Sequence, residues 1–542
     1  MIQEISAEDK LWELCVVGSG PVGQALALEF DRLGREVLVL ESGGREREAA
    51  TTDASRAEIV DADRHAEMEL AVARALGGTS LTWGGRCVAY DEIDWMDRAF
   101  VADAHWPVKS EEVRPFYKRA AEVLLCGNDE FTIPYKDRLT GGLTLDGVER
   151  WSREAKVILE HRAKILGSER IRLSLKSTVT GLNISADGTS VESLQVNTPA
   201  GPRTVRARRF VLAMGGVETT RLLLAAQRNW PTHFGGVDGP LGRYYMGHIS
   251  GKIASIHFDD PAMIDDMDFR LDDSGAYVRR RFMLTGEAQV QHSLLNTAFW
   301  PDNPPFYDPT HGSGVLSAVF LALVFPPTGR FLLPEAIRLI HTGPRPYRLG
   351  AHLWNAVVGA PRGAKDIYGI LANRLIKRPK KPGFLVKNRG GKYALHYHAE
   401  QVPQRESRIT LNDDVDGFGV PRARIDLRFA EQDVQSVIDS HRVLDAALRA
   451  NGIGRLEFWH SDETLAERVY AQASDGFHQV GTTRMGEDPT RSVVDRELKV
   501  HGLKNLHIAS SSVFPTTGQA NSTLLAVAFA VRLASRLASA PL

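Results

Sequence analysis

A glycine-rich turn near the N-terminus constrains the fold of this chain more than any other feature. Residues 11–17, LWELCVV, form a short apolar run that leads directly into GSGPVG at residues 18–23. The following QALALEFDRLG has apolar residues at helical spacing. This order predicts a strand, a tight glycine turn and a helix, which is how a dinucleotide-binding βαβ unit begins.

A second apolar run, residues 37–40, ends in Glu41, which lies 23 residues after Gly18. Glycines allow a backbone to approach a pyrophosphate, and the N-terminus of a helix offers unpaired N–H groups to it. A carboxylate about 20 residues further on accepts hydrogen bonds from ribose hydroxyls. The segment therefore predicts dinucleotide binding, with NAD and FAD both open because they share this unit.

Two more glycine pairs indicate further points where the backbone approaches a ligand. We expect a helix over residues 65–76 that runs into GGTSLTWGGR at 77–86, a loop that is either a flexible turn or a surface lying against a planar ring. Residues 189–198 and 203–213 have the pattern of a hairpin, which ends at Gly215 and Gly216 before a helix over 217–226. We also expect helices over 110–125 and 151–166.

Composition excludes several classes of protein. The 66 Lys and Arg residues balance 67 Asp and Glu residues, which excludes a nucleic-acid binder led by global charge. Three cysteines are too few for a disulfide framework or a cysteine zinc site. The first residues lack the basic and apolar stretches of a secretory signal, and no run of about 18 apolar residues occurs. We expect a cytoplasmic chain with no transmembrane segment, reaching the periplasm only if a signal-bearing partner carries it.

One segment departs from neutrality. Between residues 330 and 392 there are fourteen Lys and Arg residues but only two acidic ones. We interpret this stretch as a solvated helical insertion with a basic turn, or as a docking face for a partner subunit, an acidic electron acceptor or an anionic surface. No nucleic-acid recognition motif accompanies it.

The C-terminal region carries the most specific motifs. HQVGTTRMG at 478–486 is followed by SSSVFPTTGQANST at 510–523. With the N-terminal turn, the 77–85 loop, AMGGVET at 213–219 and LGRYYMGH at 241–248, the chain resembles the glucose-methanol-choline (GMC) family of FAD-dependent alcohol oxidoreductases. Within that family it is most similar to the branch of pyranose oxidases, bacterial glycoside 3-dehydrogenases and fructose dehydrogenase.

The resemblance implies bound FAD and a catalytic pair, His478 and Asn521. It implies cofactor contacts from Gly18, Ser19, Gly20, Gly23, Glu41, Ser42, Gly78, Thr79, Thr82, Trp83, Gly84, Gly85, Val179, Ala213, Gly215, Ser510 and Thr523. Two positions depart from the family pattern. Thr82 replaces the histidine that carries the flavin covalently in pyranose oxidases, so we expect noncovalent FAD. Ser510 replaces the acid usual near the SVFP segment, so the FAD contact that the family makes there with an acid is open in this chain.

The chemistry follows from these residue types. Oxidation of an alcohol by hydride transfer to flavin N5 needs a base for the hydroxyl proton, and neutral imidazole suits this near pH 7. His478 would be that base, and Asn521 would donate an amide N–H to the substrate oxygen. His396 and His398 alternate in a strand-like run without a carboxylate or cysteine at ligand spacing, so we expect core or surface residues and no metal site. We assign no chemistry to His248 and His501.

The leading hypothesis is oxidation of an alcohol group of a sugar, glycoside or polyol. Alternatives are a non-sugar alcohol such as an aryl or lignin-derived one, a flavoprotein electron-transfer subunit, and an NAD-dependent Rossmann dehydrogenase. The sequence leaves open the substrate, the oxidised carbon, the oligomeric state and the electron acceptor, which could be O2, a quinone or a cytochrome.

We expect an α/β fold with a discontinuous, Rossmann-like FAD-binding domain at 1–100, 167–250 and 475–542. A helical connection would span 101–166. An α+β substrate domain on an antiparallel sheet would span 251–474, with the basic helical insertion at about 330–392.

Overall fold

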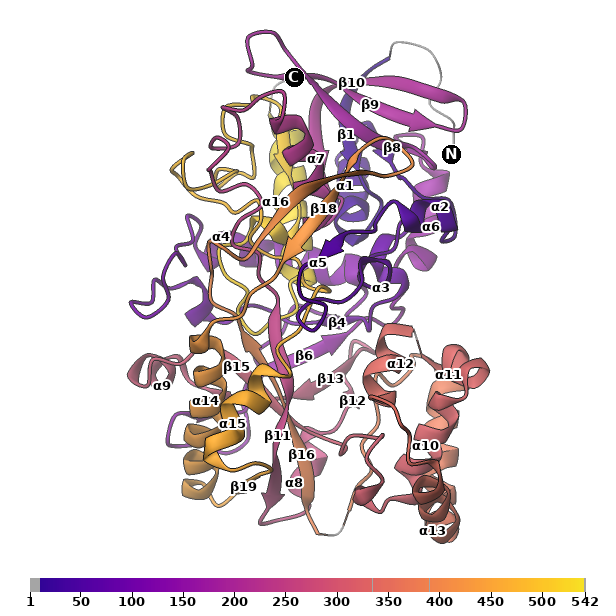
Figure 1. The fold of residues 1–542 in the computed structure, drawn as a ribbon, viewed down its shortest axis with the longest axis vertical. Coiled ribbons are helices and arrows are strands. Elements are labelled where there is room, and N and C mark those ends of the chain that lie inside the picture. The colour runs from indigo at the N-terminus through magenta and orange to yellow at the C-terminus, as the bar shows by residue number, and fades with distance from the viewer. Residues whose placement is uncertain (1–9, 334, 389, 541–542) are drawn as a thin grey trace.

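A computed structural model describes residues 10–333, 335–388 and 390–540. A mostly parallel sheet organises the half that holds both ends of the chain (Figure 1). Its parallel strands lie in the order β7 (Ile171–Ser174), β2 (Val37–Leu40), β1 (Leu11–Val17), β10 (Gly201–Leu212) and β20 (Leu506–Ile508). β9 (Val191–Thr198) and β8 (Thr178–Ile184) extend it in antiparallel fashion. The strands β1, β2 and β10 end side by side, with Val17 in register with Leu40 and Leu212.

Helices cover this sheet because its strands are apolar and buried on both faces. α1 (Pro21–Arg32) follows the glycine turn, α7 (Gly216–Gln227) follows β10, and α16 (Thr523–Ser539) packs against α1 and α5 (Tyr117–Leu124). One apolar core therefore joins the first and last elements of the chain. Cys15, in β1, is fully buried in this core, as expected for an apolar strand.

A six-stranded antiparallel sheet organises the other half (Figure 1). The order is β19 (Gly454–Phe458), β11 (His248–Phe258), β16 (Lys392–Glu400), β15 (Thr297–Asp302), β14 (Phe282–Leu284) and β5 (Leu143–Thr144). α14 (Glu431–Ala450) and α15 (Asp462–Tyr470) pack against it. Because side chains alternate along a strand, His396 and His398 face the same side of the sheet. The antiparallel sheet of the predicted substrate domain is confirmed.

Smaller elements connect these two sheets. A four-stranded sheet contains β12 (Arg270–Leu271), β13 (Tyr277–Arg280), β6 (Val148–Trp151) and β4 (Arg86–Cys87). A three-stranded sheet contains β17 (Arg408–Val415), β18 (Pro421–Asp426) and β3 (Glu58–Ile59). The short helices are α2 (Ala49–Asp53), α4 (Ser110–Val113), α8 (Met263–Met267) and α9 (Gly286–Gln291), with 3-10 turns at Gly78–Leu81, Glu92–Trp95, Arg114–Phe116, Pro309–His311 and Ser511–Val513.

Four helices form a separate bundle beside the antiparallel sheet, at the lower right of Figure 1. They are α10 (Gly314–Val324), α11 (Pro326–Leu332), α12 (Glu335–Thr342) and α13 (Leu349–Leu375). The bundle has its own small core around Phe306, Phe320 and Leu323. Within the described ranges, no single helix is long and apolar enough to cross a membrane. α10 and α11 reach that length and composition only as a pair, bent by 105°.

Two expected helices differ from the structure. Over residues 65–76 only α3 (Met68–Ala71) is helical, because the chain turns extended at Val72 and the Ala73 N–H donates to Thr79 Oγ1. Over 151–166 the helix begins later, as α6 (Ile158–Gly167), while Val148–Trp151 is strand β6. Long-range pairing of Trp151 with Tyr277 overrides the local helical pattern. Segment 101–166 is therefore not helical throughout; the predicted domain boundaries stay predictions.

Candidate active site

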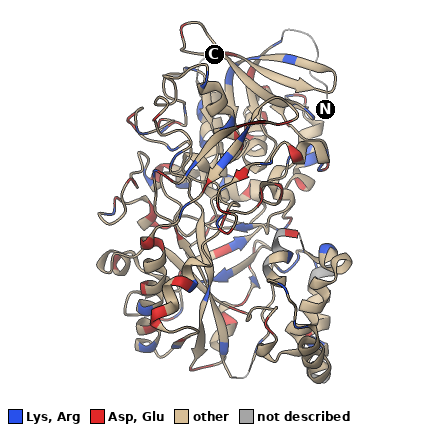
Figure 2. Cartoon of the chain, in the orientation of Figure 1, with Lys and Arg blue, Asp and Glu red and all other residues tan. Residues whose placement is uncertain are grey.

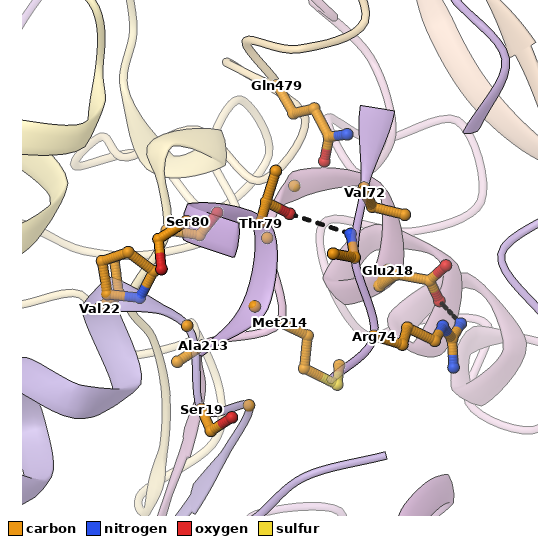
Figure 3. A pocket seen from close by; sticks show the side chains of 18 of the residues that line it. Ser19, Val22, Val72, Arg74, Thr79, Ser80, Ala213, Met214, Glu218 and Gln479 are labelled. Atoms are coloured by element: carbon orange, nitrogen blue, oxygen red, sulfur yellow. Dashed lines mark hydrogen bonds and ion pairs between the residues drawn. The ribbon is translucent and has the colours of Figure 1, made fainter. Parts of the chain in front are cut away.

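A cavity of about 430 Å³ lies where strands β1, β2 and β10 end and helices α1, α7 and α16 begin. Segments far apart in the sequence thus form one site (Figure 3). Of the nineteen predicted site residues, seventeen line it: Gly18, Ser19, Gly20, Glu41, Ser42, Gly78, Thr79, Thr82, Trp83, Gly84, Val179, Ala213, Gly215, His478, Ser510, Asn521 and Thr523. Gly23 and Gly85 are not among the residues that line it.

Glycine is required in the turn for two different reasons. Gly18 has a φ of +104°, and a Cβ there would lie 2.5 Å from the carbonyl oxygen of Ala213. A Cβ on Gly23 would lie 1.9 Å from the Gly18 carbonyl oxygen, so Gly23 allows the helix to pack on the turn and does not itself line the cavity. A Cβ on Gly78 would lie 2.7 Å from Gly20 Cα. The cavity wall is thus bare backbone in close contact.

Glu41 lies at the end of β2, as the spacing predicts, and its carboxylate is buried. Ser19 donates to Glu41 Oε2 from its backbone N at 3.0 Å and from its hydroxyl at 2.6 Å, and the Gly43 N–H donates to Oε1 at 2.8 Å. Burial raises the pKa of Glu41, while these hydrogen bonds oppose the rise. The carboxylate is held rigidly beside the turn, facing the cavity.

The sequence analysis missed a charged network on the opposite wall. Arg74 forms an ion pair with Glu218 at 2.5 Å (Figure 3), and Arg221 forms one with Asp416 at 2.6 Å. All four residues line the cavity. Glu218 belongs to the AMGGVET motif, so an acid next to a glycine pair could have predicted that it lines the cavity. Asp416 lies in a turn without a motif, so nothing in the sequence predicted its position.

The donor set fits a dinucleotide such as FAD. The N-terminus of α1 has no side-chain cap and lies beside Gly18 and Gly78, where a Cβ would not fit, and a buried acid lies at the ribose-binding position of the turn. Thr82, whose hydroxyl donates to the Thr79 carbonyl at 3.1 Å, has no nucleophilic nitrogen for a covalent link. Ser510 accepts a hydrogen bond from the Ser512 N–H at the cavity wall.

His478 and Asn521 meet at the end of this cavity. The Asn521 amide nitrogen lies 2.7 Å from His478 Nε2, although 43 residues separate them. His478 Nδ1 lies 3.0 Å from Asp475 Oδ2, and Asp475 also accepts from the His478 backbone N–H at 3.0 Å. Asn521 Oδ1 is buried and has no hydrogen-bond partner in the described part of the chain.

The charge of Asp475 fixes the orientation of His478. Burial opposes ionisation of this carboxyl, yet neighbouring His478 and His248 hold its pKa well below its usual range. An ionised carboxylate only accepts hydrogen bonds, so His478 Nδ1 carries a hydrogen. In the neutral imidazole, Nε2 is then the lone-pair nitrogen, and it accepts from the Asn521 amide. The structure therefore presents a basic nitrogen and an amide donor side by side.

Two more histidines lie against His478, which the sequence analysis did not foresee. The rings of His248 and His398 are 4.3 Å apart, and that of His248 is 4.6 Å from the ring of His478. Burial lowers the pKa of His248 to about 4 and that of His398 well below its usual range, so both are neutral near pH 7. A ring nitrogen of each of the three lies within 4.8 Å of the others, but His478 Nδ1 and Nε2 and His398 Nδ1 already make hydrogen bonds.

A second cavity, of about 940 Å³, meets the first at Thr82, Trp83 and Gly84. Its lining combines the antiparallel sheet with the helical bundle, through residues such as Trp300, Phe306, Leu323, Phe331 and Leu371. No sequence motif marks this region. It offers a volume suited to a substrate next to the loop that separates the two cavities.

Polar side chains form one part of this second cavity. Asp302 pairs with Lys252 at 2.8 Å and lies 3.6 Å from His396 Nδ1, while His396 Nε2 hydrogen-bonds the Ser250 hydroxyl at 2.9 Å. Burial favours the neutral form of the Asp302 carboxyl, but Lys252 and His396 hold its pKa well below its usual range. Trp300 stacks on the His396 ring at 4.5 Å. His396 is thus neither an isolated surface residue nor an apolar core residue.

Comparison with known proteins agrees with this geometry. A family model described as GMC oxidoreductase matches residues 403–530. The chain is 24% identical to 6'''-hydroxyparomomycin C oxidase of Streptomyces lividus over 99% of this chain and 93% of that protein. It is 35% identical to C-glycoside 3-oxidase of Arthrobacter globiformis over 25% of each chain. It is 30% identical to the fructose dehydrogenase large subunit of Gluconobacter japonicus over 27% of this chain and 24% of that protein.

Solved structures share the fold. Pyridoxine 4-oxidase from Mesorbium loti matches with a TM-score of 0.51 and 15% identity, covering 97% of this chain and 99% of the other. A fungal aryl-alcohol oxidase matches with a TM-score of 0.51 and 13% identity, covering 98% and 99%. The predicted α/β fold class is confirmed.

Proposed function

We propose that the chain is a GMC-type oxidoreductase that uses FAD to oxidise an alcohol group of a sugar, glycoside or polyol to a carbonyl, as the family match over residues 403–530 supports. The observation that carries this proposal is the pair of His478 and Asn521, held 2.7 Å apart at the first cavity, which meets a larger one at residues 82–84. The names of the full-length relative and of C-glycoside 3-oxidase support a carbohydrate hydroxyl as the reacting group.

The side chains supply binding and proton transfer. When bound, FAD supplies the hydride acceptor at N5. Asn521 donates its amide N–H to the substrate oxygen, and His478 Nε2 takes the hydroxyl proton. Asp475 stabilises the imidazolium that results, because its buried carboxylate lies 3.0 Å from Nδ1. Transfer of the proton is easier beside a fixed negative charge than in its absence.

The remaining details of the proposal concern cofactor attachment, acceptor and location. FAD is held without a covalent link, because the loop offers Thr82 where a histidine would be needed. Electrons leave to O2, a quinone or a cytochrome. The protein acts in the cytoplasm, or in the periplasm if a signal-bearing partner carries it.

The test is the visible spectrum of the purified protein during anaerobic addition of sugars, glycosides, polyols and aryl alcohols. A sugar-type alcohol should bleach the flavin absorption band at about 450 nm. His478→Ala should keep FAD and lose about 10²- to 10⁴-fold in the rate of bleaching. If only aryl alcohols bleached the flavin, the substrate would be an aryl alcohol and not a sugar-type one. An unchanged rate of bleaching in His478→Ala would show that His478 is not the base. Acid precipitation that releases the yellow colour into the supernatant would support noncovalent FAD.

A further inference from the structure

The outer face of α13 is apolar although it is exposed. Along this helix of 27 residues, the large exposed apolar side chains are Leu349, Leu353, Trp354, Val357, Val358, Tyr368 and Leu371. At 100° per residue these positions fall within one half of the helix circumference. The opposite half packs on α10 through buried positions such as His352 and Gly363. A surface helix of a soluble protein normally has polar residues on the face that meets water.

The apolar exposure is concentrated in this bundle. Of the 23 large hydrophobic residues that are exposed in the described chain, 11 lie between Phe325 and Ile376. Trp354 is 70% exposed, Val357 is 71% exposed and Phe331 is 76% exposed. Figure 2 shows the four helices of the bundle mostly without charged residues along their length. A contiguous apolar surface of this kind indicates an interaction site.

Basic side chains lie at both ends of this apolar helix. Arg345 and Arg348 precede its first turn, and Lys377, Arg378 and Lys380 follow its last one; all five are exposed. A long helix with an apolar outer face, aromatic side chains and cations at its ends is typical of a segment that lies in the interface of an anionic membrane. The cations would contact lipid phosphates while Trp354 and its neighbours enter the acyl region.

The second cavity adds an independent reason to expect lipid. Phe331 and Leu371 line the 940 Å³ cavity and are also exposed, so the cavity wall continues into the apolar surface of the bundle. The same lining contains Arg330, Arg378 and Lys380, so apolar side chains and cations lie together where the cavity meets the bundle, which suits the acyl and phosphate layers of a bilayer. A purely acidic protein surface would satisfy the cations but would leave the aliphatic face of α13 in contact with water.

We propose that the helical bundle docks on the surface of an anionic lipid bilayer through the outer face of α13, with the mouth of the second cavity turned toward the lipid. This inference does not depend on the proposed reaction, because it rests on the exposed side chains described between residues 325 and 380 and on the wall of the second cavity. Of the partners that we considered for the basic segment at 330–392, the proposal favours an anionic surface over a partner subunit or an acidic electron acceptor. The bundle does not span the bilayer; it lies in its interface.

The test uses the full-length protein with vesicles of phosphatidylcholine, with and without phosphatidylglycerol, in a flotation assay. We expect binding to the mixed vesicles, weaker binding to phosphatidylcholine alone, and a loss on raising the salt concentration. Val357→Asp combined with Val358→Asp should reduce binding by about 10-fold or more, because two charges would enter the acyl region. The matched control is Val237→Asp, since Val237 is also 71% exposed but lies in the other half of the chain.

A second pair of variants tests the cations. Lys377→Gln with Arg378→Gln should weaken binding to the anionic vesicles, whereas Arg162→Gln with Lys164→Gln, exposed cations of α6, should not. Quenching of tryptophan fluorescence by brominated lipids should fall in Trp354→Phe. No vesicle binding, or binding that Val357→Asp with Val358→Asp leaves intact, would overturn the proposal. A dimer that these aspartates dissociate, without vesicle binding, would assign the face to a second copy of the chain instead.

Discussion

The two cavities that meet at residues 82–84 are built in different ways. The first has backbone in much of its wall: Gly18 and Gly78 bring chain segments together where a Cβ would not fit. The second is walled by side chains from a sheet and a helical bundle that are distant in sequence. Recognition by backbone restricts the residue type to glycine, whereas a wall of side chains accepts many combinations. The first cavity can therefore be predicted from the sequence, whereas the second cannot.

The largest effect is expected from a substitution that adds a methyl group to the wall of the first cavity. Gly18→Ala should abolish FAD binding, because the Cβ would lie 2.5 Å from the Ala213 carbonyl oxygen and push the turn open. The matched control is Gly201→Ala, which has a similar φ of +99° but nothing within 4 Å of its Cβ. The control should keep its flavin and lose only about 1–2 kcal/mol from backbone strain. Flavin absorbance and thermal unfolding measure both; full flavin content in Gly18→Ala would contradict the contact argument.

The next test compares two carboxylates that each lie beside a histidine: Asp475, buried behind His478 of the first cavity, and Asp302, half-buried in the second. Asp475→Asn should keep FAD and lower the rate of flavin reduction on the order of 10²-fold, because the amide cannot stabilise the charged His478 ring. The binding of substrate should change little. Stopped-flow reduction at saturating substrate measures this rate. If Asp475→Asn reduced only the affinity for substrate, the carboxylate would not assist proton transfer.

Asp302→Asn is the counterpart in the second cavity and should have a smaller effect on the rate. Loss of its ion pair with Lys252 would loosen His396 and Trp300, which stack at 4.5 Å. We expect the KM to rise by about 10-fold, with the limiting rate of reduction nearly unchanged, because uniform binding is lost. Steady-state kinetics with the best substrate from the alcohol panel separates the two parameters. A fall in the limiting rate equal to that of Asp475→Asn would remove the distinction between the cavities.

The same contrast explains how far the sequence could be interpreted. The turn at 18–23 and the acid at 41 were predicted because a dinucleotide-binding turn restricts their spacing and residue types. His478 and Asn521 were predicted from the resemblance of their motifs to those of a known family. The charge pair of Arg74 and Glu218 was missed because charged side chains are common and only the fold brings these two together. Trp151, the last residue of strand β6, was taken for the start of a helix because its pairing with Tyr277 cannot be predicted from local periodicity.

Histidines show the limit of residue-by-residue interpretation. The pattern at 396 and 398 suggested unremarkable core or surface positions, and only the register of the antiparallel sheet reveals that His398 contacts the His248 ring. Spacing of two residues places both on one face of a strand but does not say what that face meets. The partner lies on β11, about 150 residues away, and sequence alone offers no link between them.

A buried histidine in the antiparallel-sheet half predicts that acid lowers the stability of the fold, separately from any effect on flavin binding or rate. His441, in α14, is fully buried against the antiparallel sheet, and burial lowers its pKa to about 4. In the unfolded chain the pKa would be near 6.5, so below that pH the unfolded state takes up a proton that the folded state refuses. Stability is therefore lost as the pH falls from about 6.5 toward 4.

His441→Phe should remove this contribution, which amounts to about 2 kcal/mol between pH 7 and pH 5. The ring lies 4.9 Å from Phe299 and makes one side-chain hydrogen bond, to the Val437 carbonyl, so a phenyl ring can occupy its place. Denaturant unfolding at the two pH values should show a smaller difference in the variant than in the parent protein. Phe299→Leu is the control, because it weakens the same packing without removing a titrating group and should lower stability equally at both values. An unchanged pH difference in His441→Phe would mean that the acid response arises at other buried histidines, for instance at His507 in strand β20 of the parallel sheet, whose pKa burial also lowers to about 4.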